Sequence, residues 1–201
     1  MRIAWMFIVL GLTGWAQGVQ NMEYIVMVGG VHSPTSTVEG SNVVLYGSSG
    51  VTFQMSFGYQ VKSTKAGNLW IETPFTYAWQ GTGAIAGTNL AGFTRDVTYI
   101  TPGVRLKSPT FGRVSFYGAA GGGYAGFWRI DGVVSGTNGT VAANTSFHPS
   151  AIFDYAGGID IRLSRLLSLR AEGRDFFGAT NLGGVTGHNH PVFLIGLAFH
   201  R

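Results

Sequence analysis

The feature that most constrains this chain is a two-residue alternation of polar and apolar side chains. In the stretch SLRAEGRDFF, the polar positions are Ser168, Arg170, Glu172 and Arg174. Successive side chains of a β-strand point to opposite faces, so the pattern predicts a strand with one charged and one apolar face. Alternation alone does not say which face lies inside. A soluble barrel turns its polar face to water, whereas a membrane barrel turns it to the lumen.

The same pattern recurs along the chain and predicts eight strands separated by turn-rich stretches. The predicted strands are Met22–His32 (with poor alternation), Val51–Lys62, Leu69–Gln80, Val97–Lys107, Val114–Trp128, Ala151–Leu163, Leu166–Phe176 and Pro191–His200. Their connections alternate in length. STKAGN, SPTFGR and SR are short, whereas the loops predicted at 33–50, 81–96, 129–150 and 177–190 are long. Short turns at one end and long loops at the other are typical of an up-and-down barrel.

The first residues, 1–18, form a candidate signal peptide. Arg2 precedes an apolar run from Ile3 to Leu12, and small residues follow at Gly14 and Ala16. A membrane anchor is the alternative, but it needs about 20 apolar residues. We therefore expect an exported chain with one domain at 19–201.

Two segments, RVSFYGAAGGGYAGF and LSLRAEGRDFFG, resemble the generic outer-membrane β-barrel domain. Together with the strand pattern, they make roughly residues 20–201 similar to the small OmpA/OmpX-type barrels. The resemblance implies an all-β fold, an eight-stranded antiparallel up-and-down transmembrane β-barrel of the bacterial outer membrane. Its short turns and termini would face the periplasm, and its long loops the outside.

Composition favours lipid on the outside. Only 11% of the residues are charged, where soluble domains have about 25%. The predicted lumen charges have both signs: Glu72, Arg105, Lys107, Asp154, Asp160, Arg162, Arg170, Glu172 and Arg174. The opposite face carries a predicted aromatic girdle: Tyr59, Tyr77, Trp79, Tyr124, Trp128, Tyr155 and Phe199. A soluble lipocalin-like binding barrel is the alternative, but such rings would crowd its cavity.

These patterns predict a non-catalytic outer-membrane barrel with a structural or surface-interaction role. Its lumen would be plugged by the mixed charges, because eight strands leave a space that side chains fill. The expected partners are outer-membrane lipid and an extracellular partner of the long loops. No basic cluster indicates nucleic acid, and the absence of cysteine excludes disulfides and thiol catalysis.

Two other functions stay open. One is a narrow gated pore. The other is a lipid-modifying enzyme, for which His190 would act with Ser146 or Ser150 and with Asp175, although no sequence signature surrounds these residues.

Four histidines fall at the predicted long-loop end: His32, His148, His188 and His190. Imidazoles suit zinc or copper, but nothing fixes their relative positions. We expect solvent-exposed loop histidines, no metal site and no cofactor.

Two prolines, Pro74 and Pro102, fall in the middle of consecutive predicted strands, almost side by side. Proline cannot donate a hydrogen bond to a sheet. The pair therefore predicts a bulge or missing ladder bonds at this seam.

Overall fold

The computed structural model describes residues 21–33, 36–37, 44–45, 48–84, 91–135, 141–178 and 189–201. Its strands are β1 (Met22–Ser33), β2 (Ser36–Thr37), β3 (Val44–Leu45), β4 (Ser48–Thr64), β5 (Gly67–Ala84), β6 (Ala91–Ile100), β7 (Gly103–Lys107), β8 (Val114–Ser135), β9 (Val141–Arg162), β10 (Leu167–Gly178) and β11 (Asn189–His200). Among the described residues, no helix is long and apolar enough to cross a membrane.

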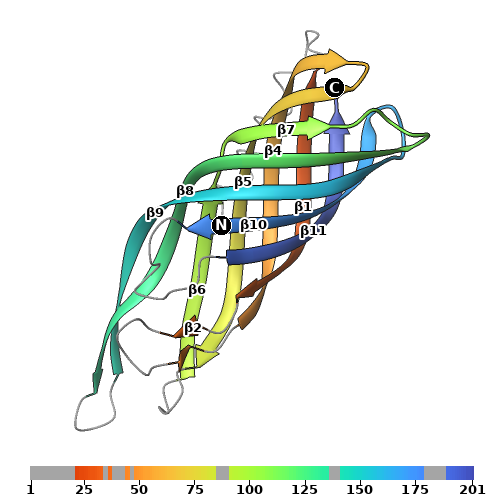
Figure 1. Ribbon diagram of the computed structural model, residues 1–201. Helices are drawn as coiled ribbons and strands as arrows, with labels where there is room; N and C mark the ends of the chain where they lie inside the picture. Colours follow the sequence, from red (N-terminus) through yellow and green to blue (C-terminus); the bar gives the residue numbers. More distant parts are fainter. Residues whose placement is uncertain are drawn as a thin grey trace, which may run out of the picture.

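The main sheet closes on itself as an antiparallel barrel. The order of pairing is β4-β1-β11-β10-β9-β8-β6-β5-β7, with β4–β5 and β7–β8 completing the ring. Strands β6 and β7 follow each other along the chain between the same neighbours, β5 and β8, and together occupy one position of the ring (Figure 1). The barrel therefore has eight strand positions, each of which we call a wall. The predicted fold class, including the strand number and the up-and-down order, is confirmed. Closure leaves the main sheet of the described chain without an open edge along the barrel wall.

The predicted seam is the gap between β6 and β7. Phe75 pairs with Ile100, and Glu72 pairs with Gly103. Between these two pairs, β5 and the chain from β6 to β7 each advance by three residues. No residue is therefore inserted, and there is no bulge. The ladder is incomplete because proline lacks an N–H, although the Thr101 N–H still donates to the Pro74 carbonyl oxygen at 3.3 Å. The prediction of a bulge or missing ladder bonds is confirmed in its second form: ladder bonds are missing, and no bulge is present at the seam.

Side-chain parity is regular around the barrel. In β10, the even positions from Ser168 to Gly178 are buried, and the odd positions are more exposed. In β4, Phe53, Met55 and Phe57 face outward, whereas Gln54 and Ser56 are buried. The exposed apolar positions form a continuous outer surface, which is the arrangement that lipid contact requires.

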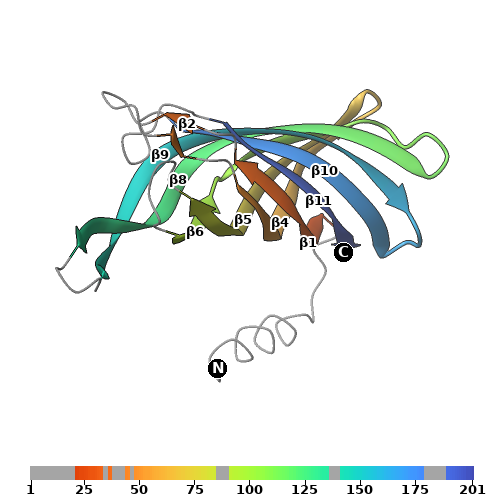
Figure 2. The same ribbon diagram turned by 90° about the horizontal axis from the view of Figure 1, so that it is seen from below.

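The loop-side ends differ from the sequence prediction. Residues 129–150 were expected to form a loop, but β8 continues to Ser135 and β9 begins at Val141. After Phe127 in β8 and before Ile152 in β9, the described residues of these two strands pair only with each other, so a two-stranded ribbon extends past the neighbouring strands (Figures 1 and 2). The prediction failed because a ribbon of this kind is held by backbone bonds, and needs no apolar face to mark it in the sequence.

The other predicted loops are also shorter than expected. β5 runs to Ala84 and β6 begins at Ala91, β10 runs to Gly178 and β11 begins at Asn189, and β2 and β3 lie within 33–50. The predicted signal peptide, residues 1–18, lies outside the described residues.

Candidate functional site

A network of buried charges fills the lumen. Parity sends the side chains of Glu72, Arg105, Asp154, Asp160, Arg170, Glu172 and Arg174 inward, and each is at least 95% buried. Lys107 reaches the same space from the end of β7. Burying one such charge without a partner would cost several kcal/mol, so the pairing of these side chains decides whether the arrangement is stable.

One half of the network surrounds Asp160 and Arg170. The Arg170 Nε and Nη2 atoms each donate to Asp160 at 2.6 Å. The Lys107 ammonium lies 2.5 Å from the same carboxylate. Such two-pronged guanidinium–carboxylate contacts are among the strongest polar contacts in proteins.

The other half centres on Arg174. Its Nε donates to Glu172 at 2.8 Å, its Nη2 donates to Glu72 at 2.9 Å, and its Nη1 donates to Asp154. Three carboxylates therefore share one guanidinium, whose donors are directed in a fixed fork.

These contacts cross the lumen. Arg174 on β10 and Glu72 on β5 stand four walls apart in either direction, which is diametrically opposite in this barrel. Arg105 on β7 pairs with Glu23 on β1, three walls away. The side chains of opposite walls are thus joined directly across the lumen.

Sequence reasoning missed several members of the network. Glu23 is fully buried and contacts Arg105, and its Oε2 accepts from Arg170 at 3.1 Å. It was missed because Ile25 and Met27 also face inward, which spoils the alternation of β1. Glu23 lies two residues before Ile25 and therefore points to the same face of the strand, and this parity could have identified it as a lumen residue.

Neutral side chains complete the network. The Tyr117 hydroxyl donates to Glu172 at 2.7 Å, and the Gln54 amide donates to the other oxygen of Glu172 at 3.2 Å. The Tyr117 ring also lies under the Arg170 guanidinium, 4.7 Å from its centroid. Arg105 lies 5.1 Å from the centre of the Trp70 ring. Aromatic faces stabilise desolvated guanidinium groups in this position.

Arg162 stands apart from the other predicted lumen residues. It lies at the short-turn mouth, its side chain is exposed, and it forms no ion pair with the described part of the chain. Its position in the alternation of β9 corresponds to the lumen face, as predicted. Because β9 ends at Arg162, however, the side chain is exposed to solvent.

The lumen is not polar throughout, as the sequence had suggested. Toward the long-loop end, an apolar layer contains Val31, Val97, Tyr99, Ile152, Phe176 and Val192. The rings of Tyr99 and Phe176 stack at 4.0 Å between centroids, although β6 and β10 stand three walls apart. A second, apolar closure of the lumen therefore lies between the charged network and the long-loop end.

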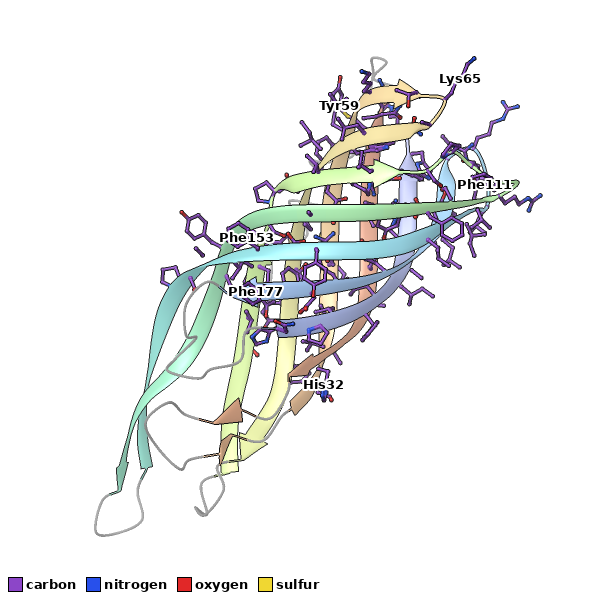
Figure 3. All side chains as sticks on the ribbon, in the orientation of Figure 1. His32, Tyr59, Lys65, Phe111, Phe153 and Phe177 are labelled. Atoms are coloured by element: carbon purple, nitrogen blue, oxygen red, sulfur yellow. The ribbon has the colours of Figure 1, made fainter. Side chains whose placement is uncertain are left out.

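The outer face carries the predicted girdle residues whose side chains are described. Tyr59, Tyr77, Trp79, Tyr124, Tyr155 and Phe199 all point outward, and Figure 3 shows Tyr59 and Phe153 directed away from the wall. The side chain of Trp128 lies outside the described residues. The Tyr77 hydroxyl donates to Asp96 at 2.9 Å, and that of Tyr155 donates to Asp175 at 2.7 Å.

Among the described residues of the loop-side catalytic set considered from the sequence, Asp175 lies apart from the other two. Asp175 lies on the outer face, where Tyr155 binds it, whereas His190 and Ser150 have the inward parity of their strands. Asp175 therefore cannot orient the imidazole of His190. The side chains of Ser146 and His148, and the whole of His188, lie outside the described residues. Within the described residues, no group of His, Asp and Glu side chains is arranged to hold a metal ion.

Comparisons with known proteins give a fold. No family model matches the sequence. No curated protein matches it either. Among solved structures, Neisserial surface protein A is similar at 13% identity, covering 89% of this chain and 97% of that chain, with a TM-score of 0.59.

Two further structures agree with it. The outer membrane protein OprG from Pseudomonas aeruginosa is 15% identical, covering 90% of this chain and 97% of its own, with a TM-score of 0.53. Ail, the attachment invasion locus protein of Yersinia pestis, is 13% identical, covering 91% and 100%, with a TM-score of 0.51. The chain has the fold of the small eight-stranded outer-membrane β-barrels.

Proposed function

We propose that this protein is a sealed barrel of the bacterial outer membrane, whose role is structural and lies in contacts made by its long-loop end. In this proposal, the short turns and both chain termini face the periplasm, and the β8–β9 ribbon stands outside the cell.

The pairing of opposite walls carries the proposal. The 2.9 Å contact between Arg174 and Glu72 spans the lumen, and the Tyr99–Phe176 stack spans it again nearer the long-loop end. A permanently open pore needs a continuous water path, and these two closures argue against one. The narrow-pore alternative would require both to rearrange.

The outer surface supports the membrane location. Large apolar side chains such as Phe53, Phe153 and Phe193 are more than 40% exposed, and they cover the wall facing outward. Water would make such a surface prone to association, whereas lipid satisfies it. A soluble lipocalin-like barrel would need a polar exterior around an apolar cavity, which is the opposite of this arrangement.

Planar-bilayer conductance of the refolded protein tests the sealed lumen. The wild type should show no steady conductance. Sequence reasoning alone would expect Glu172→Ala to open the channel, but the apolar layer gives a second closure. We therefore expect Glu172→Ala alone to stay closed. Glu72→Ala removes the carboxylate that meets Arg174 across the lumen, so Glu72→Ala combined with Phe176→Ala should conduct.

The matched control is Lys65→Ala, in the turn between β4 and β5, which should behave as the wild type. A steady open level in the wild type would overturn the sealed barrel. A double variant that folds and stays closed would show that these two layers are not what closes it.

A further inference from the structure

The short-turn mouth of the barrel brings together a serine, a histidine and a glutamate from three neighbouring strands. The register pairs Glu23 of β1 with His200 of β11, and it pairs Ala198 of β11 with Ser168 of β10. His200 is therefore diagonal to Ser168 on the lumen face. The next pair in the same direction joins Ser168 to Arg162 of β9. A row of four polar side chains crosses four adjacent strands.

The distances within this row are those of a nucleophile, a base and a group that orients the base. Ser168 Oγ lies 2.7 Å from His200 Nε2. His200 Nδ1 lies 3.1 Å from Glu23 Oε1. The base role requires the tautomer whose proton is on Nδ1, on the side of the carboxylate, so that Nε2 can accept the serine proton. Glu23 itself is held by Arg105 and Arg170, so its carboxylate is fixed in position.

Ser168 and His200 both line a cavity of about 150 Å³, and Ser168 itself is 2% exposed. Lys107, Arg162 and Arg201 also line the cavity. Arg162 is the cation beside Ser168, and it forms no ion pair with the described residues. The cavity therefore suits a small molecule that carries a negative charge.

We propose that Ser168 and His200 are the catalytic residues of an esterase site that cleaves small anionic acyl esters, with Glu23 as the positioning residue. Ser168 Oγ attacks the acyl carbon while His200 Nε2 takes its proton. The ester C–O bond breaks, and His200 returns the proton to the leaving alcohol. Water then attacks the acyl-serine in the same way, which releases a carboxylic acid and restores the serine.

The Arg162 guanidinium provides positive charge for the negative oxygen of the tetrahedral intermediate or for the substrate's own anionic group. This proposed site departs from the expectation, drawn from the sequence, of a non-catalytic barrel. It leaves the sealed lumen and the surface role unchanged, because it uses only the mouth at the opposite end from the long loops.

Labelling of the full-length protein, refolded in detergent, with a fluorophosphonate probe tests the site. The expected result is one labelled residue, identified as Ser168 by mass spectrometry. Because the wild-type protein is used, this identification does not depend on whether a variant folds. His200→Gln should slow the labelling by about 100-fold or more, which is the usual contribution of a general base. Ser164→Ala, in the exposed turn that precedes β10, is the control and should label at the wild-type rate.

Substrate charge is tested with 4-nitrophenyl acetate and the anionic mono-4-nitrophenyl succinate. The wild type should prefer the succinate, and Arg162→Gln should abolish that preference. Each protein is first checked for folding by its heat-dependent mobility in gel electrophoresis. Folded wild type that is not labelled, or is labelled at another serine, overturns the site. Unchanged labelling in folded His200→Gln overturns the role of the base, and equal rates with both esters overturn the anionic substrate.

Discussion

At the scale of single residues, the lumen depends on partners that approach from several walls. Glu172 is 5% exposed and receives hydrogen bonds from Arg174, Tyr117 and Gln54. Parity along β10 was enough to predict that Glu172 and Arg174 face inward. The partners on distant walls could not be predicted, because they depend on how the closed barrel tilts and staggers its strands.

Removal of the Glu172 carboxylate tests this pairing. Glu172→Ala leaves the Arg174 guanidinium with less compensation in a buried site, so it should lower the free energy of unfolding by about 3–5 kcal/mol. Urea titration of the protein in lipid vesicles measures the change, with Lys65→Ala as the unaffected reference. A titration curve that coincides with the wild type would mean that Glu172 is not part of a buried network.

Gly158 tests the packing of the same network. A Cβ atom built on Gly158 would lie 2.4 Å from the Tyr117 ring and 2.5 Å from the Ala171 carbonyl oxygen. Gly158→Ala should therefore push Tyr117 away from Glu172 and destabilise the barrel by about 1–3 kcal/mol. Gly118 is the matched control, because its Cβ would meet nothing closer than 3.8 Å. Equal unfolding curves for the Gly158→Ala and Gly118→Ala variants would contradict the packing described for Tyr117.

At the scale of strands, the seam and the ribbon are two departures from a regular barrel, besides register shifts such as that between Gln60 and Lys62 of β4. The seam was predictable because proline has one physical consequence, the loss of a donor. The ribbon was not, since its strands continue where the alternation of 114–128 and 151–163 has ended. The alternation marks the part of a strand that has a lumen on one side, not the whole strand.

Amide hydrogen exchange tests the seam. The Thr101 N–H donates at 3.3 Å to the Pro74 carbonyl oxygen, and the Gly122 N–H donates at 3.2 Å to that of Pro102. Both amides should exchange faster than the paired amides of Tyr99 and Arg105. Pro74→Ala supplies an N–H opposite Thr101 and should slow exchange at Thr101. Uniform protection through residues 99–105 in the wild type would contradict the broken ladder.

The orientation of the ribbon is tested on intact cells. An epitope inserted near residue 138, between β8 and β9, should be accessible to antibody without permeabilisation. One inserted near Ser108, between β7 and β8, should become accessible only after the outer membrane is opened. The opposite labelling pattern would reverse the proposed orientation.

At the scale of the whole molecule, the account rests on an apolar exterior around a charged interior. Charge fraction and alternation predicted this arrangement, and the closed fold is shared with the small outer-membrane barrels. The sequence did not indicate that Tyr99 and Phe176 form a second closure, because aromatic rings on the lumen face do not reveal whether they meet across it.

Lipid contact can be measured along β4 with nitroxide labels, because the chain has no cysteine of its own. Single cysteines would replace the outward residues Val51, Phe53, Met55, Phe57 and Tyr59, with one at Lys65 as the reference in the turn. In lipid vesicles, the account predicts frequent collisions with oxygen and few with a water-soluble nickel complex at the five strand positions, with the greatest contrast near Met55 and the reverse at Lys65. Frequent collisions with the nickel complex at all five strand positions would contradict the lipid-facing exterior and the membrane barrel with it.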